Sequence, residues 1–156
     1  MEARFDLNAN EIGAKFAKRF FTASLVLAQA LPKAVQELVS LRVSQINGCG
    51  WCTDVHTKEA AAAGESAARI NLVAAWREAG VFTEAERAAF ALAEEGTRLA
   101  DAHQGVSDDT WALVREHYDD NEVAALVSLV AQINAANRLG VILRQAGGAY
   151  QPGLFG

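Results

Sequence analysis

The chain has 156 residues, of which 51% are hydrophobic and only 2 are proline, so it fits a single folded domain and argues against extended disorder. The formal net charge of -5 argues against the basic surface that nucleic-acid-binding proteins carry. Two cysteines are too few for a disulfide scaffold in a chain of this size, so the composition predicts a protein of the reducing cytoplasm.

The N-terminal part has some features of a targeting segment. Three basic residues within 15–19 precede the apolar stretch 20–30, as in a secretory signal peptide. Acidic residues precede that basic group, however, and Thr22 and Ser24 interrupt the apolar stretch. No run approaches the roughly 18 apolar residues that a membrane span requires. We therefore expect neither secretion nor a membrane partner.

In chain order, the hydrophobic pattern is helical almost throughout. Apolar residues at helical spacing predict a helix over residues 10–30, and Pro32 marks a break before the next helix. A second helix is predicted over 33–46 and stops at the glycine of Asn47-Gly48. A third helix is predicted from about residue 51 to residue 63.

Capping residues define the next two helices. Ser66 is the predicted N-cap of a fourth helix, which ends near Gly80. Thr83 and Glu86 form a capping box for a fifth helix that reaches about Leu99. These signals depend on side-chain oxygens that can accept from the free amides of a first turn.

The C-terminal part contains the longest predicted helix. A short sixth helix is predicted after Ser107, followed by a long one over about 120–146 that Gly147-Gly148 closes. Apolar residues cover much of the circumference of this last helix, so we expect it to be central or buried by a partner. The tail, 149–156, has no helical period and is expected to pack loosely or against another subunit.

These elements predict an all-α bundle of about six to seven helices in a single domain, 1–156. The short connections favour antiparallel neighbours. No metal, flavin or nicotinamide site is evident, because no glycine-rich phosphate loop follows a strand. We therefore predict no cofactor.

The two cysteines lie close together in the motif Cys49-Gly50-Trp51-Cys52, and His56 follows. At the start of a helix, free amides and the helix dipole favour a thiolate. His56 lies four residues after Cys52, so the two side chains share a helix face and the imidazole can exchange a proton with the thiol. The spacing predicts a dithiol/disulfide couple.

Glu37 is a further candidate because it interrupts the apolar pattern of the second helix. The turn at Asn47-Gly48 folds this helix back beside the third, which can bring Glu37 near Cys49 or His56. A buried carboxylate there would have a raised pKa and could join a proton relay. Periodicity alone favours the alternative of a glutamate on the solvent face of an amphipathic helix.

The four residues Glu37, Cys49, Cys52 and His56 lie in a longer stretch that closely resembles the core of AhpD-like alkylhydroperoxidases. These enzymes belong to the carboxymuconolactone decarboxylase superfamily. The resemblance continues through 56–60, 63–65 and 74–78, and reappears at 133–139, so that it covers roughly 33–146.

The resemblance implies an all-helical, homo-oligomeric enzyme of antioxidant defence that reduces hydroperoxides or relays electrons from a dithiol reductant to a protein disulfide or a peroxiredoxin. By position, Cys52 resembles the attacking thiol and Cys49 the resolving thiol, while Glu37 and His56 resemble the proton relay. Trp51 departs from the pattern, because AhpD proper carries a second histidine at this position.

Several alternatives remain open. The chain could instead be an acid–base enzyme of the decarboxylase type, or a non-catalytic helical oligomer that senses oxidation. A zinc site would need His103 or His117 as the ligand beyond the two cysteines and His56. Asn134, Asn137 and Arg138 interrupt the last helix and could support the site, cap a helix or lie at an interface.

Overall fold

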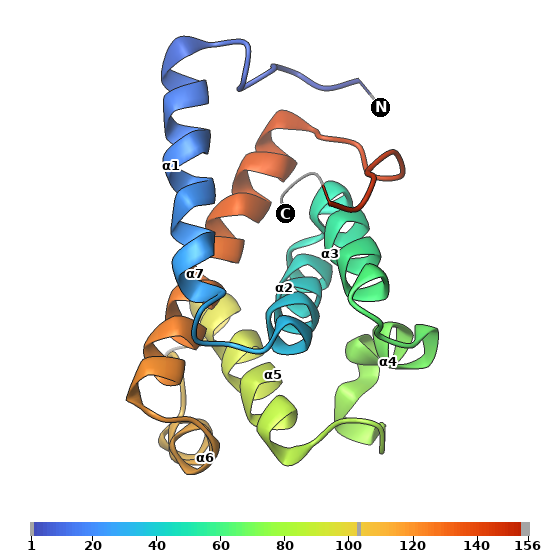
Figure 1. Ribbon diagram of the computed structural model, residues 1–156. Helices are drawn as coiled ribbons and strands as arrows, with labels where there is room; N and C mark the ends of the chain where they lie inside the picture. Colours follow the sequence, from blue (N-terminus) through green and yellow to red (C-terminus); the bar gives the residue numbers. More distant parts are fainter. Residues whose placement is uncertain (1, 103, 154–156) are drawn as a thin grey trace.

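The computed structural model describes residues 2–102 and 104–153. In this part of the chain all regular secondary structure is helical (Figure 1). The bundle has seven α-helices and no strand in these ranges, which confirms the predicted fold class. The helices are α1 (Glu11–Leu27), α2 (Lys33–Asn47), α3 (Gly50–Ala62), α4 (Ala67–Leu72), α5 (Glu84–Thr97), α6 (Asp108–His117) and α7 (Asp120–Leu143), with the short 3-10 turns η1 (Val73–Glu78) and η2 (Leu99–Asp101) between them.

Most helices begin at a polar side chain that caps the first turn. The predicted capping box is present: the Thr83 hydroxyl accepts from the Glu86 amide, and the Glu86 carboxylate accepts from the Thr83 amide. Asp119 and Glu122 make a second box at the start of α7. The other N-caps with side-chain hydrogen bonds are Asn10, Cys49, Ser66 and Ser107.

Two predicted helices end earlier than expected. The fourth segment is not continuous, because α4 stops at Leu72 and Ala75 leaves helical geometry inside η1. The last helix ends at Leu143 rather than near 146, because Arg144 adopts the left-handed conformation with φ 55°. The amides of Arg144 and Gln145 then bond back to Val141 and Gly140, which satisfies the last carbonyls of the helix.

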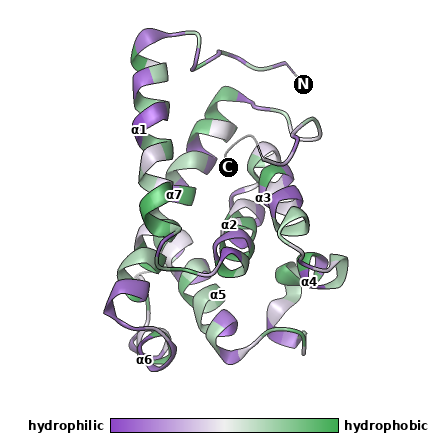
Figure 2. Cartoon of the chain, in the orientation of Figure 1, coloured by the Kyte–Doolittle hydropathy of each residue, from purple (hydrophilic) through white to green (hydrophobic). Residues whose placement is uncertain are grey.

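α2 is the centre of the bundle. It contacts α3, α5 and α7, and its apolar residues Leu38, Val39, Leu41 and Val43 are fully or almost fully buried. Figure 2 shows helices that are hydrophobic on one side and hydrophilic on the other, as expected for amphipathic helices around one core. Because α3 follows α2 after a two-residue turn, the cysteine motif begins directly after this central helix.

α7 corrects one expectation drawn from the sequence. By length and composition α7 could cross a membrane, so the expectation that no segment approaches a membrane span was wrong. Within this fold, however, α7 packs on α1, α2, α3 and α5. Its Asn134 and Asn137 side chains accept hydrogen bonds from Asn47 on α2, at 2.9 Å each. These contacts are those of a core helix in a folded bundle.

The segment after α7 also differs from expectation. We call residues 145–153 the C-terminal strap. It is attached to α3 of the same chain, where Tyr150 is 1% exposed, and so is not loosely packed. Figure 1 shows the strap returning from the end of α7 to the side of α3.

Candidate active site

The two cysteines lie at the start of α3 and form a disulfide bond, with their Cα atoms 5.3 Å apart. Gly48 makes this start possible, because its left-handed φ of 66° ends α2 and reverses the chain. Cys49 is the N-cap of α3, and its sulfur accepts from the Cys52 amide at 3.3 Å. Cys52 therefore lies in the first turn, as the sequence predicted. The side chains are buried, with 1% of Cys49 and 5% of Cys52 exposed.

A glycine of α7 lies against the two sulfurs. A Cβ atom at Gly140 would be 2.7 Å from the Cys49 Sγ and 3.4 Å from the Cys52 Sγ. The first distance is too short for any side chain, so only glycine allows α7 to approach the disulfide this closely. Sequence reasoning missed Gly140. An isolated glycine inside a long apolar helix was the available signal.

Glu37 and His56 meet across the α2–α3 pair. The Glu37 Oε2 is 2.8 Å from the His56 Nδ1, and the Glu37 Oε1 is 2.8 Å from the Lys33 Nζ. Glu37 is 6% exposed, so it is not on the solvent face of its helix. His56 lies one helical turn after Cys52. The fold therefore brings Glu37 beside His56 on the helix that carries both thiols.

The expected rise in the pKa of Glu37 is wrong. Burial does raise the pKa, but the hydrogen bonds and charges of His56 and Lys33 outweigh it and hold the pKa of this carboxyl below its usual value. Glu37 is therefore ionised near neutral pH and accepts hydrogen bonds only. It fixes the proton on His56 Nδ1, which leaves Nε2 to accept a proton when the ring is neutral.

A buried polar network supports the turn that precedes the cysteines. The Asn137 amide donates to the Ser44 hydroxyl at 3.0 Å, and Asn47 donates to both Asn134 and Asn137. The guanidinium of Arg138 donates to the Asn134 carbonyl. These asparagines tie the last turn of α2 to α7 immediately before Cys49.

The zinc alternative finds no support. No group of three or more metal-ligating side chains exists within residues 2–102 and 104–153. His117 ends α6, which makes its main contacts with α5, whereas His103 lies outside the described residues. Trp51, between the cysteines, meets the Tyr150 ring edge-on with the centroids 5.8 Å apart.

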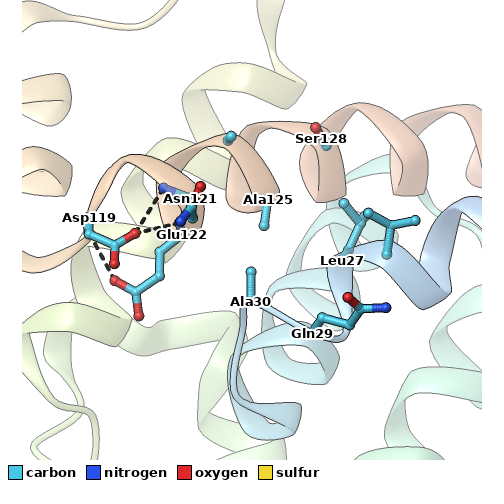
Figure 3. Close-up of a pocket in the computed structure, with 10 residues that line it drawn as sticks. Leu27, Gln29, Ala30, Asp119, Asn121, Glu122, Ala125 and Ser128 are labelled. Carbon is cyan, nitrogen blue, oxygen red and sulfur yellow. Dashed lines mark hydrogen bonds between the residues drawn. The ribbon is translucent and has the colours of Figure 1, made fainter.

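Two surface hollows lie away from this site. One, of about 610 Å³, lies between the end of α1 and the start of α7 (Figure 3). The Asp119 and Glu122 side chains that line it are engaged in the capping box of α7, as the dashed lines in the figure show. The other, of about 600 Å³, is apolar and lies between α5, α6 and α7. Neither hollow is lined by a cysteine, His56 or Glu37. The candidate site is therefore defined by these reactive side chains and not by a hollow.

Comparisons with known proteins agree with the fold. The chain is 37% identical over 114 residues to YdfG of Bacillus subtilis (strain 168), an uncharacterised protein, which is 73% of this chain and 76% of that protein. It matches the crystal structure of a protein of unknown function from Agrobacterium tumefaciens, described as a candidate AhpD antioxidant defence protein. That match has a TM-score of 0.86 and 31% identity, and covers 96% of this chain and all of the other.

A more distant structure shows the same fold. An uncharacterised peroxidase-related protein with an alkylhydroperoxidase AhpD core, from Ralstonia eutropha JMP134, superposes with a TM-score of 0.72 at 19% identity. The match covers 85% of this chain and 70% of that one. Residues 14–95, more than half of the chain, match the model of the carboxymuconolactone decarboxylase family. The chain is therefore an AhpD-like member of the carboxymuconolactone decarboxylase family.

Proposed function

We propose that this protein is a thiol-dependent peroxidase or disulfide oxidoreductase of AhpD type that serves antioxidant defence in the cytoplasm. One observation carries the proposal: the only two cysteines are bonded to each other at the start of α3, one helical turn before a histidine that a buried carboxylate orients. A decarboxylation needs no dithiol, whereas a redox cycle uses each of these groups.

In the oxidative step, His56 Nε2 takes the proton of the Cys52 thiol. The thiolate attacks the terminal oxygen of a hydroperoxide and breaks the O–O bond, so that the sulfur becomes a sulfenic acid and an alkoxide leaves. The alkoxide takes the proton from His56 and departs as an alcohol. Cys49 then attacks the sulfenic sulfur, which closes the disulfide and releases water.

In the reductive step, a thiolate of a dithiol reductant attacks the Cys52 sulfur and displaces Cys49. The Cys49 thiolate keeps the hydrogen bond from the Cys52 amide and the favourable end of the helix dipole, so it is a good leaving group. The second thiol of the reductant releases Cys52 and becomes a disulfide. A peroxiredoxin disulfide can replace the hydroperoxide as the oxidant. Trp51 weakens this second reaction, because AhpD proper carries a histidine at its position.

The test is turnover with cumene hydroperoxide and dithiothreitol, comparing the wild type with Cys52→Ser. We expect repeated cycles in the wild type and none in the variant. A single oxidation without cycling would favour a redox sensor and overturn the proposal. Undiminished decarboxylase activity of Cys52→Ser on a carboxymuconolactone would overturn it in favour of an acid–base enzyme.

We also propose that the protein forms a homo-oligomer. Along α1, Gly13 is the one buried residue, so this helix covers little of its own chain. Apolar residues on the remaining surface of α1 and on the nearby end of α7 are exposed, and their burial against a partner would be favourable. They are Ile12, Phe16, Leu25, Val26, Val141 and Ile142.

Charge favours a second copy as the partner of α1. The helix carries three basic residues, at Lys15, Lys18 and Arg19, whereas α6 begins with Asp108 and Asp109 beside the apolar hollow described above. Such complementarity fits a head-to-tail contact between copies. Sedimentation equilibrium should give a mass above the 16.6 kDa of one chain. A monomer at micromolar concentration would contradict this part of the proposal.

A further inference from the structure

The C-terminal strap is fixed to α3 by a set of paired hydrogen bonds. The Asp54 carboxylate accepts from the amides of Gly148 and Tyr150, at 2.6 and 3.1 Å. The Lys58 ammonium donates to the carbonyls of the same two residues, at 3.1 and 3.0 Å. Asp54 and Lys58 are themselves an ion pair at 2.7 Å. The Asp54–Lys58 pair thus binds both the amides and the carbonyls of the strap backbone.

A third anchor lies further along α3. The Glu59 carboxylate accepts from the Tyr150 hydroxyl, and its Oε1 also accepts from the Gly153 amide at 2.8 Å. The Tyr150 side chain is buried, although the strap residues on either side of it are exposed. The strap is therefore attached through a few polar contacts and one aromatic ring. Such a segment opens at a lower free energy than the core helices do.

The strap contacts the two residues between the cysteines. A Cβ atom at Gly147 would be 2.4 Å from the carbonyl oxygen of Gly50, so the two backbones are in direct contact. Tyr150 packs edge-on against Trp51. At the near end of the strap, the Gln145 Oε1 lies 3.6 Å from the Gly140 Cβ position that also meets both sulfurs. The strap thus lies against the segment that joins the two cysteines.

Access to the disulfide is limited, because both cysteines are buried. Reduction requires a thiolate to approach Cys52 along the S–S bond, and the Cys52 side chain is 5% exposed. A small thiol needs a narrow opening, whereas a protein thiol brings its own backbone against the surface around Trp51. That surface is occupied by the strap.

We propose that the strap determines which reductants reach the dithiol: it admits small thiols while closed, and protein dithiols only when it opens. The inference rests on the proposed redox function of Cys49 and Cys52. In the step concerned, the incoming thiolate bonds to the Cys52 sulfur, the S–S bond breaks, and Cys49 leaves as a thiolate that takes a proton from water. The second thiol of the reductant then releases Cys52 and is oxidised with the first.

The experiment compares two reductants on the oxidised protein. Stopped-flow fluorescence and thiol trapping give the second-order rates of reduction by dithiothreitol and by a thioredoxin, for the wild type, Asp54→Asn and Lys58→Met. Glu11→Gln is the matched control, because it removes another ion pair of (i,i+4) spacing, with Lys15, that is far from the strap in the sequence. Thermal unfolding monitors the fold of each variant.

Each loosened anchor weakens hydrogen bonds of the closed strap, so the thioredoxin rate should rise about tenfold and the dithiothreitol rate less than about twofold. Glu11→Gln should change neither rate. Equal rises for both reductants, or no rise at all, would overturn the proposal. Should Asp54→Asn unfold, native-state hydrogen exchange in the wild type decides: the Tyr150 amide must exchange faster than the amides of α2.

The two proposals fail in different ways. Reduction of the disulfide is stoichiometric and needs no peroxide, so the selectivity of the strap can hold in a protein without peroxidase turnover. Turnover with unchanged selectivity would remove the role of the strap alone.

Discussion

Glu37 and Glu94 are both buried carboxylates paired with cations, yet their partners differ in kind. The Glu94 Oε1 accepts from Arg42 Nε at 2.7 Å and from Trp76 Nε1 at 3.0 Å, while Arg77 binds its other oxygen. An arginine never loses its proton in a protein, so the cations of this cluster keep their charge at any pH at which the protein is folded. Glu37 instead binds the imidazole of His56, on the helix that carries the two cysteines.

The difference separates a structural ion cluster from a reactive one. Hydrogen bonds and charges lower the pKa of both carboxyls against the opposing effect of burial. A shifted pKa alone therefore does not distinguish the two sites. The titratable partner and the neighbouring thiols do, and they assign the chemistry to Glu37.

Removal of the Glu94 carboxylate should have the largest effect. Glu94→Ala leaves the guanidinium of Arg42 buried without a counter-charge, so we expect a loss of about 3 kcal/mol in the free energy of unfolding. Urea unfolding monitored by circular dichroism measures this loss. Reduction of the disulfide in the folded variant should be unchanged, and a loss below about 1 kcal/mol would contradict the assigned structural role.

Replacement of Glu37 should reverse the pattern. Glu37→Gln keeps the size of the side chain but removes the negative charge that fixes the His56 ring, so peroxide turnover should fall about 10- to 100-fold. The loss of stability should be smaller than that of Glu94→Ala. Steady-state rates together with urea unfolding separate the two effects, and unchanged turnover would show that the Glu37–His56 pair does not act in the cycle.

Acid should weaken both carboxylates together. Their pKa values are lower in the folded protein than in the unfolded chain, so their contribution to stability is complete above the usual carboxyl range. It is lost as the pH falls through the lower, folded pKa values. Urea midpoints measured from neutral to acidic pH should therefore decrease, and the decrease should be smaller in Glu94→Gln. A midpoint independent of pH would contradict the pairing.

Lys33 should have the smallest effect of the four. It is 55% exposed, so Lys33→Met should change the free energy of unfolding by less than about 1 kcal/mol. The acid limb of the turnover profile should nevertheless move to higher pH, because the pKa of Glu37 rises when the neighbouring ammonium group of Lys33 is removed. A profile that does not move would exclude Lys33 from the electrostatics of the site.

Much of the fold could be predicted because its signals are local. Ser66, Thr83 and Ser107 each accept from an amide two or three residues ahead, so capping fixed their helices independently of the remaining chain. The end of α7 could not be predicted in this way. Arg144 has no local preference for the left-handed conformation, and the position of the stop coincides with the start of the strap on α3.

The site divides along the same line. His56 follows Cys52 by one turn of the same helix, so their shared face could be read from spacing. Gly140 could not be assigned to the site, because its role depends on how α7 packs against the cysteines. Lys33 precedes Glu37 by four residues of the same helix, so its contact with Glu37 could have been inferred from spacing. The direction of the pKa shift of Glu37 was missed because its burial was foreseen, whereas its contact with the Lys33 ammonium was not.

The Cys49 sulfur, as the N-cap of α3, also determines how variants of this site should be made. Serine is a good N-cap and alanine is a poor one, with a difference of about 1 kcal/mol. Cys49→Ala would therefore remove the thiol and fray the helix that carries Cys52 and His56 at the same time. Cys49→Ser removes only the redox chemistry, so the serine variant is the one whose kinetics can be interpreted.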